Sequence, residues 1–489
     1  MIHKSYSSLL ILSLLWAVVA CTAHKQAHSP TVKVITTTGD RSKEFKTDTL
    51  ALFSADKTTN ANITLKPTEK FQTVYGFGAA ITGSTCYNLM QMSPADRKNF
   101  LIQTFSETEG FGQNYVRVSI GCSDFSLSEY TLCDTKGIDN FALTQEETKY
   151  VIPILKEILA INPKVQIIGS PWTPPRWMKV NNLTDLQPYD HWTSGQLNPA
   201  LYQDYALYFA KWLQAMKDNG LNVNAITIQN EPLNRGNSAS MYMGWDEQLA
   251  FIKKALGKTL RDKGFAEVKI YLFDHNYNYD NMPSQQQYPL HIYKDTEASQ
   301  YITGAAYHNY GGNPDELNNI HNQYPNKELI FTESSIGTWN DGRNLERRLT
   351  EDMQELGIKT LNNHCKAVMV WNLMLDEHGA PNREGGCKTC FGAVDIQTSD
   401  YKTMQRNSHY YVISHLSSVI KQGATRIGVE KTTDDNVQCT AFQNLDGSLA
   451  CVLLNKKKEA THLTLSTGKL YFSYEVPANS VVSFLIPKI

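Results

Sequence analysis

The stretch Ala225-Ile-Thr-Ile-Gln-Asn-Glu231-Pro232 is a short apolar run that stops at a glutamate, and Glu328-Leu-Ile-Phe-Thr-Glu333-Ser334 repeats the pattern. Such runs are typical of buried parallel strands, and a carboxylate at a strand end lies at the rim of the sheet, where ligands bind. Two carboxylates at one rim are the groups that acid/base chemistry on a sugar requires. We therefore expect Glu231 and Glu333 to face one site.

The chain between its two ends alternates strand-like and helix-like segments. Candidate strands are 76–82, 115–121, 165–171, 225–230, 268–274, 304–310, 329–333 and 367–373, and candidate helices include 94–104, 144–161, 199–217 and 246–263. This α/β pattern predicts a (β/α)₈ TIM barrel. An open doubly wound sheet is the alternative, but no Gly-x-Gly-x-x-Gly turn opens a helix after a strand.

Both chain ends have the alternating texture of short strands, and Asp446-Gly447 between two apolar runs predicts a hairpin. We expect the ends to build one accessory β-sandwich. The predicted divisions are a signal peptide over residues 1–20, sandwich strands over 30–74, the catalytic barrel over 75–410 and the rest of the sandwich over 411–489.

Composition narrows the class of protein. The 489 residues are 41% hydrophobic, which is enough for large cores, and 46 basic against 48 acidic residues include no basic run that would follow phosphates. Nucleic acid is therefore not an expected partner. His275 and His308 lack the His-Glu-x-x-His spacing of a metal hydrolase, so we expect neither a metal nor another cofactor.

The N-terminus carries an apolar stretch from Leu9 to Ala20, which is too short to span a bilayer and is typical of an export signal. Small residues before Cys21 resemble the lipobox of bacterial lipoproteins, in which that cysteine is acylated. We expect an outer-membrane or cell-surface lipoprotein that meets the membrane only through Cys21. Cleavage by an ordinary signal peptidase, giving a periplasmic or secreted protein, is the alternative.

Cys387-Lys-Thr-Cys390 invites a zinc or redox interpretation. A zinc site would need a second ligand pair at similar spacing, and none is visible. We expect a small surface disulfide or two free thiols.

Polar residues gather at the carboxyl ends of the candidate strands, which all open on one mouth in a barrel. They are Arg117, Asp124, Trp172, Asn230, Glu231, Asp274, His275, His308, Tyr310, Glu333, Trp371 and Asn372. Each also has a structural interpretation: Glu231 could simply end a strand, Glu333 could pair with Arg117, and the tryptophans could be core residues. At a barrel mouth, Trp172 and Trp371 are better placed to wall a sugar subsite.

Several ordered motifs resemble the glucosylceramidase family, glycoside hydrolase family 30. They are Leu65–Gly78, Arg117-Val, Cys122-Ser-Asp124-Phe-Ser, Ser170-Pro-Trp-Thr-Pro-Pro-Arg-Trp-Met-Lys179, Gln229-Asn-Glu-Pro232, His308-Asn-Tyr310, Thr332-Glu-Ser334 and Trp371-Asn-Leu373. The resemblance implies a barrel with a β-sandwich and a retaining mechanism on β-linked glycosides.

The resemblance also implies roles for individual residues. Glu231 would be the general acid/base and Glu333 the nucleophile, with Tyr310 orienting it. Asn230 would bind the sugar 2-hydroxyl. The resemblance places Arg117 and His308 around Glu333, and Asp124, Trp172 and Trp371 around the non-reducing glucose. Positive charge would keep Glu333 ionised, whereas burial without a cation would raise the pKa of Glu231.

The substrate is less closely defined by the sequence. The loop Leu233–Tyr242 is short and lacks the aromatic-rich insertion of animal glucosylceramidases, and Asn309 stands where an aromatic is often found. A lipid-anchored exported enzyme would meet polysaccharide more often than ceramide, so we favour an endo-β-1,6-glucanase. Glucosylceramidase or another β-glycosidase of the family is the first alternative, and a non-catalytic surface glycan-binding lipoprotein is the second.

Overall fold

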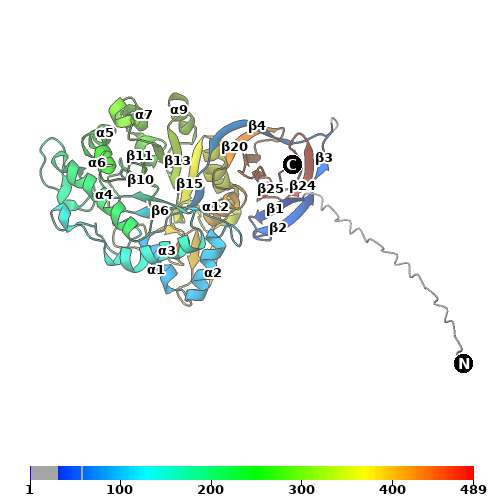
Figure 1. Cartoon of the computed structure of the whole chain (residues 1–489), viewed down its shortest axis with the longest axis horizontal. Coiled ribbons are helices and arrows are strands. Elements are labelled where there is room, and N and C mark those ends of the chain that lie inside the picture. The colour runs from blue at the N-terminus through cyan, green and yellow to red at the C-terminus, as the bar shows by residue number, and fades with distance from the viewer. Residues whose placement is uncertain (2–30, 57–58, 489) are drawn as a thin grey trace.

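The computed structural model describes residues 31–56 and 59–488 together with Met1. It shows a barrel of parallel strands surrounded by helices, with a β-sandwich packed beside it (Figure 1). The expected signal segment and Cys21 lie outside the described residues. Within the described residues, we find no helix whose length and hydropathy would let it cross a membrane.

All eight predicted barrel strands are present, which confirms the predicted barrel. They are β5 (Gly76–Ala79), β6 (Tyr115–Ser119), β7 (Gln166–Ser170), β10 (Ala225–Thr227), β11 (Lys269–Asn276), β12 (Gly304–His308), β13 (Glu328–Glu333) and β15 (Cys365–Val370). They pair in the order β5-β15-β13-β12-β11-β10-β7-β6. The two edges meet where the Ile81 N–H donates to the Arg117 carbonyl at 2.8 Å.

Helices cover the outside of this barrel (Figure 1). The longer ones are α1 (Gly83–Gln91), α2 (Pro94–Phe105), α3 (Ile152–Ile161), α4 (Tyr202–Asp218), α9 (Asp315–Gln323), α10 (Leu345–Asp352) and α12 (Ser408–Val419). Helix α2 begins as its sequence indicates, because the Ser93 side chain accepts from the Asp96 N–H and Pro94 occupies the first turn. The predicted helix over 246–263 is divided into α5 (Trp245–Phe251), a π-helical segment and α6 (Gly257–Asp262).

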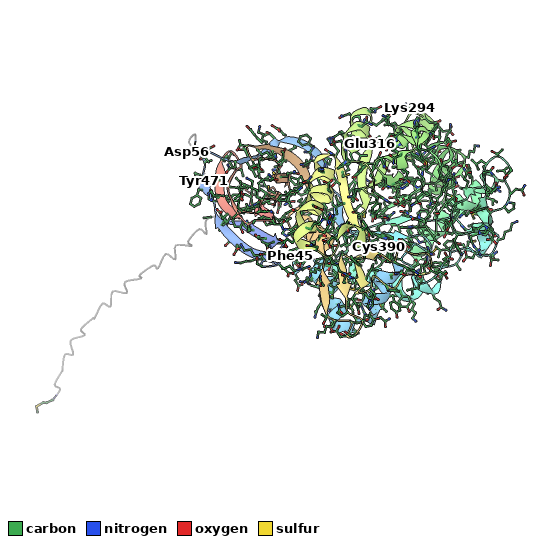
Figure 2. The ribbon with its side chains drawn as sticks, turned by 180° about the vertical axis from the view of Figure 1, so that it is seen from behind. Phe45, Asp56, Lys294, Glu316, Cys390 and Tyr471 are labelled. Carbon is green, nitrogen blue, oxygen red and sulfur yellow. A yellow bond between two sulfur atoms is a disulfide. The ribbon has the colours of Figure 1, made fainter. Side chains whose placement is uncertain are left out.

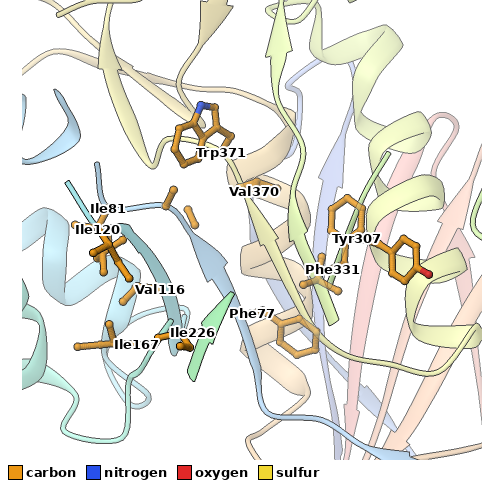
Figure 3. Close-up of a cluster of buried hydrophobic side chains, with 14 of the residues drawn as sticks. Phe77, Ile81, Val116, Ile120, Ile167, Ile226, Tyr307, Phe331, Val370 and Trp371 are labelled. Carbon is orange, nitrogen blue, oxygen red and sulfur yellow. The ribbon is translucent and has the colours of Figure 1, made fainter. Parts of the chain in front are cut away.

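Successive side chains along each strand point alternately to two apolar clusters. Val116, Ile167 and Ile226 belong to the main core between the strands and the helices (Figure 3). The neighbouring positions Tyr115 and Ile168 belong to a separate cluster enclosed by the strands. Arg117 follows on the same side as Tyr115, so this alternation carries a charged side chain into the barrel interior.

The sandwich is made from both chain ends, as predicted. Its strands are β1 (Thr31–Thr38), β2 (Lys46–Ala51), β3 (Phe53–Ser54), β4 (Ile63–Thr73), β20 (Thr425–Lys431), β21 (Val437–Gln443), β22 (Leu449–Asn455), β23 (Thr461–Ser466), β24 (Leu470–Val476) and β25 (Ser480–Ile486). Strand β1 pairs with β25, and β4 pairs with β20. The predicted hairpin is confirmed between β21 and β22. Tyr471 and Asp56 mark the sandwich, whereas Lys294 and Glu316 lie on the barrel (Figure 2).

Candidate active site

Asp274 is the centre of a buried polar layer inside the barrel. A bulge in β11 between Phe273 and His275 shifts the strand register, and the φ of 65° at Asp274 turns its backbone out of the extended conformation. Its carboxylate accepts hydrogen bonds from Arg117 Nη2 (2.9 Å), Ser170 Oγ (2.8 Å), Thr227 Oγ1 (2.6 Å), His308 Nε2 (3.0 Å) and Thr332 Oγ1 (2.6 Å). Burial alone would raise the pKa of Asp274, but Arg117 and His308 hold it well below its usual range.

Arg117 connects this layer to Glu333. Its Nη1 donates to Glu333 Oε2 at 2.5 Å, and its Nη2 also donates to Asn230 Oδ1 at 2.7 Å. Tyr310 donates its hydroxyl proton to Glu333 Oε1 at 3.1 Å. Both oxygens of Glu333 therefore accept a hydrogen bond, and the two donors fix the orientation of the carboxylate. Both the structural pairing with Arg117 and the contact from Tyr310 that the sequence suggested are present.

Glu231 is held by a different set of donors. Its φ of 44° places the backbone in the left-handed region, which is uncommon outside glycine. Its Oε1 accepts from His308 Nδ1 at 3.3 Å, and its Oε2 accepts from the side-chain amides of Asn234 at 2.8 Å and Asn237 at 2.7 Å. His275 Nε2 lies 4.0 Å from Oε1.

The expectation that Glu231 lacks a cation, and so has a raised pKa, is wrong. Burial would raise the pKa of Glu231, but His275, His308 and Asn234 lower it to about 2. His308 lies nearer to Glu231 than to Glu333, from which its Nδ1 is 3.9 Å away. Burial would lower the pKa of His308, but Glu333, Asp274 and Glu231 raise it to about 9. His308 is thus a cation between the two glutamates.

Burial raises the pKa of Glu333, and the negative charge of Glu231 adds to this effect, whereas His308 and Arg117 oppose it. Protonation of Glu231 would remove that negative charge and let Glu333 ionise more readily. The ionisation of each carboxyl group therefore affects that of the other, and contacts with the substrate can change the balance between them.

The two glutamates lie close enough together to act on a single sugar residue. One oxygen of Glu231, one oxygen of Glu333 and a nitrogen of His308 all lie within 4.8 Å of one another. Retaining glycosidases separate their carboxyl groups by about 5–5.5 Å and inverting ones by about 6.5–9.5 Å. The same three side chains could also ligate a divalent metal, so activity in the presence of a chelator is a useful check.

These carboxylates open into a pocket of 290 Å³. Its lining comprises Asp124, Glu231, Asn234, Asn237, Asn276, Tyr310, Glu333, Ser335, Trp339, Trp371, Cys387 and Cys390. A hollow of 650 Å³ between α10 and the sandwich is larger, but its lining includes neither Glu231 nor Glu333. The pocket that contains both glutamates is therefore the candidate active site.

Seven of the twelve residues predicted at the barrel mouth lie behind the pocket wall. Trp172 is only 2% exposed, stacks on Trp371 with ring centroids 5.1 Å apart, and covers the Arg117 guanidinium at 4.9 Å. The other six are likewise buried and are absent from the lining: Arg117, Asn230, Asp274, His275, His308 and Asn372. Of the two predicted tryptophans, only Trp371 reaches the pocket in this structure. Trp172 instead fixes Trp371 and Arg117.

Asp124 lies at one side of the pocket, where burial and the charge of Glu333 raise its pKa to about 7. Arg383 holds the loop that carries it, because its Nε donates to the Ser123 carbonyl at 2.8 Å. Arg383 Nη1 donates to Ser238 Oγ at 3.2 Å, which ties in the loop after Glu231.

The same segment contains the Cys387–Cys390 disulfide, which confirms one of the two alternatives expected for these cysteines. Figure 2 shows Cys390 within the barrel part of the molecule. Sequence reasoning overlooked this loop contact and also Asn234, Asn237 and Trp339. Their only signal was proximity to the two glutamates along the chain.

Comparisons with known proteins agree with this fold. Residues 74–420 match the profile of the glycosyl hydrolase family 30 TIM-barrel domain, and residues 423–484 match that of the family 30 β-sandwich domain. An endo-1,6-β-D-glucanase of Trichoderma harzianum is 32% identical over 440 residues, covering 86% of this chain and 85% of that protein. Lysosomal acid glucosylceramidase of Mus musculus is 28% identical over 452 residues, covering 86% and 83%. A solved structure of an endo-β1,6-glucanase is 59% identical with a TM-score of 0.90, covering 94% of this chain and all of that one (100%).

Proposed function

This chain belongs to glycosyl hydrolase family 30, and we propose that it is an endo-β-1,6-glucanase that cleaves by double displacement with retention of configuration. The observation that carries the mechanism is the approach of Glu231 and Glu333 to within 4.8 Å. Likeness to endo-β-1,6-glucanases over most of the chain supports the substrate.

In the first step, Glu333 attacks the anomeric carbon of the sugar in the pocket. The bond from that carbon to the glycosidic oxygen breaks, and Glu231 donates a proton to the leaving oxygen. Arg117 and Tyr310 position the attacking carboxylate through their bonds to its two oxygens. The product is a glycosyl ester on Glu333 and a free chain end.

In the second step, Glu231 acts as a base. It takes a proton from a water molecule, whose oxygen attacks the anomeric carbon and releases Glu333 as a carboxylate. The surroundings of Glu231 suit this step, because three donors stabilise its ionised form. Two inversions at the same carbon give overall retention.

The substrate assignment predicts that β-1,6-glucan is converted to oligosaccharides, while β-1,3-glucan, xylan and glucosylceramide are cleaved far more slowly. Product analysis on this panel is the measurement, with proton NMR to read the first anomer released. A β-anomer supports retention and an α-anomer contradicts it. If the enzyme releases glucose from glucosylceramide and cleaves none of the polysaccharides, its substrate is that of the glucosylceramidases and not β-1,6-glucan.

The same panel decides between the classes of protein. A glycan-binding lipoprotein without turnover would bind β-1,6-glucan and release no product. A metal hydrolase using Glu231, His308 and Glu333 as ligands would lose activity in a chelator. We expect neither of these outcomes, because hydrogen-bond donors stabilise both carboxylates without a metal.

We also propose that the protein is exported and anchored to a membrane through Cys21. The support is the apolar stretch from Leu9 to Ala20 followed directly by this cysteine. Cys21→Ser is expected to move the protein from the membrane fraction to the soluble exported fraction, as measured by fractionation and immunoblotting. Unchanged fractionation would contradict the anchor.

A further inference from the structure

The hydrogen bonds of Glu231 favour its ionised form over the protonated form that it needs as an acid. A carboxylate oxygen has two lone pairs, and Oε2 of Glu231 already accepts from Asn234 at 2.8 Å and from Asn237 at 2.7 Å. Oε1 accepts from His308 Nδ1. All three donors favour an ionised carboxylate, so the departure of one amide from Oε2 lets Glu231 take up a proton more readily.

The two amides are not held equally. Asn234 Oδ1 accepts from the backbone N–H groups of Gly236 at 2.8 Å and Asn237 at 3.3 Å, which anchors its side chain in the loop. The side chain of Asn237, in contrast, makes only the bond to Glu231 among its contacts with described residues. Its Oδ1 therefore remains available, and Asn237 lines the pocket. Asn237 is the amide that can move at least cost.

We propose that Asn237 is a positioning residue that adds to the stabilisation of ionised Glu231 in the free enzyme and transfers its amide to a hydroxyl of the leaving-group sugar when substrate binds. This inference deepens the proposed function and rests on it. Oε2 then has one donor fewer, which raises the pKa of Glu231 and makes it easier for Glu231 to take up a proton from solvent. That proton later passes to the glycosidic oxygen, while Asn234 remains bonded.

The leaving-group sugar replaces the hydrogen bond that the Asn237 amide loses. Carbohydrate hydroxyls both donate and accept hydrogen bonds. A single hydroxyl can therefore accept from Asn237 Nδ2 in place of Glu231 Oε2, or donate to Asn237 Oδ1. In the second step the leaving sugar has gone and the amide can return to Oε2. Its return stabilises the ionised form just after Glu231 has lost its proton. The same contact therefore favours a carboxylate when no leaving-group sugar is present.

Other titratable groups also face Glu231 and influence its pKa. They are His308 on β12, His275 on β11 with its neighbour Asp280, Glu333 on β13, and Asp274, Arg117 and Asp124 around them. None of these groups is changed by a substitution at residue 237. A shift on changing Asn237 alone therefore reports its amide.

The first test titrates Glu231 in the free protein, with no substrate present. Glutamate labelled with ¹³C at the side-chain carboxyl gives the signal, and Glu231→Gln identifies the resonance by its loss. Asn237→Ala is expected to raise the pKa of Glu231 by about one pH unit, because one donor to the charged form is lost. Asn237→Asp is expected to raise it further, because a like charge then faces Oε2.

Asn181→Ala is the matched control, because Asn181 also donates to a carboxylate, that of Asp185 on an exposed loop, at 3.1 Å. It is expected to leave the Glu231 resonance unchanged. Wild-type titration of Glu231 in both Asn237 variants would overturn the proposal whatever the substrate of the enzyme is.

The second test compares two substrates that differ in their leaving group. Asn237→Ala is expected to lower kcat/KM about five- to tenfold for a β-1,6-gluco-oligosaccharide, and to change it little for a 2,4-dinitrophenyl β-gentiobioside, which has no leaving-group sugar. An equal loss on both substrates would overturn the contact with the leaving sugar. If the wild type cleaves neither substrate, the proposed function fails while the titration still decides whether Asn237 controls Glu231.

Discussion

Glu333→Gln is expected to lower kcat on β-1,6-glucan by on the order of 10⁵-fold, because the amide cannot form the glycosyl ester. The replacement keeps the size of the side chain and can retain the bond from Tyr310. It loses the ion pair with Arg117, which lies at 2.5 Å in the wild type. The measurement is single-turnover and steady-state hydrolysis with purified protein.

Glu328→Gln is the matched control for this loss. Glu328 begins the same strand, is partly buried, and pairs with Lys269 at 3.0 Å and Lys366 at 3.1 Å, so its replacement also breaks ion pairs. It lies at the opposite end of β13 from Glu333 and is expected to leave kcat within a few-fold of the wild type. A comparable loss in both variants would mean that Glu333 acts through stability and not through chemistry.

Glu231→Ala is expected to lower kcat on β-1,6-glucan by about 10²–10⁴-fold, the usual contribution of a general acid or base. With a 2,4-dinitrophenyl β-gentiobioside the first step needs no proton, so the glycosyl-enzyme should form and then accumulate. Azide should restore turnover and give a β-glycosyl azide, because it attacks without a base. The measurement is the burst of dinitrophenolate followed by product analysis with azide.

Glu247→Gln serves as the control for Glu231→Ala. Glu247 is also buried, and burial raises its pKa to about 7, but its carboxylate caps the start of α5 through the Gly244 N–H and is absent from the pocket lining. Azide should have no effect on this variant. Failure of azide to rescue Glu231→Ala, or an α-azide product, would contradict the assignment of Glu231 as acid/base.

The barrel was predictable because its signals are local. Apolar runs such as 225–230 and 329–333 are typical of parallel strands buried on both faces, and the structure places Ala225–Thr227 in β10 and 329–333 in β13. The meeting of Glu231 and Glu333 then follows from topology, since strand ends in a closed barrel open on one mouth. The pairing of β1 with β25 was predictable only as shared composition of the two chain ends.

The electrostatics of the site were not predictable, because they depend on features without a sequence signal. The bulge before His275 turns Asp274 into the barrel, and Asp274 then fixes His308 so that its other nitrogen reaches Glu231. A prediction that assumes regular alternation along β11 does not reveal this arrangement. The contact from Asn237 depends on a loop conformation, and nothing in its spacing from Glu231 indicates it.

The most direct test of the account is to trap the covalent intermediate. The protein is incubated with 2,4-dinitrophenyl 2-deoxy-2-fluoro-β-glucoside, whose fluorine slows both steps and the second more than the first. The glycosyl ester therefore persists and can be located by peptide mass spectrometry. The account predicts a single adduct on Glu333, and none in Glu333→Gln. An adduct on Glu231 or elsewhere, or hydrolysis by the wild type that passes through no adduct, would contradict it.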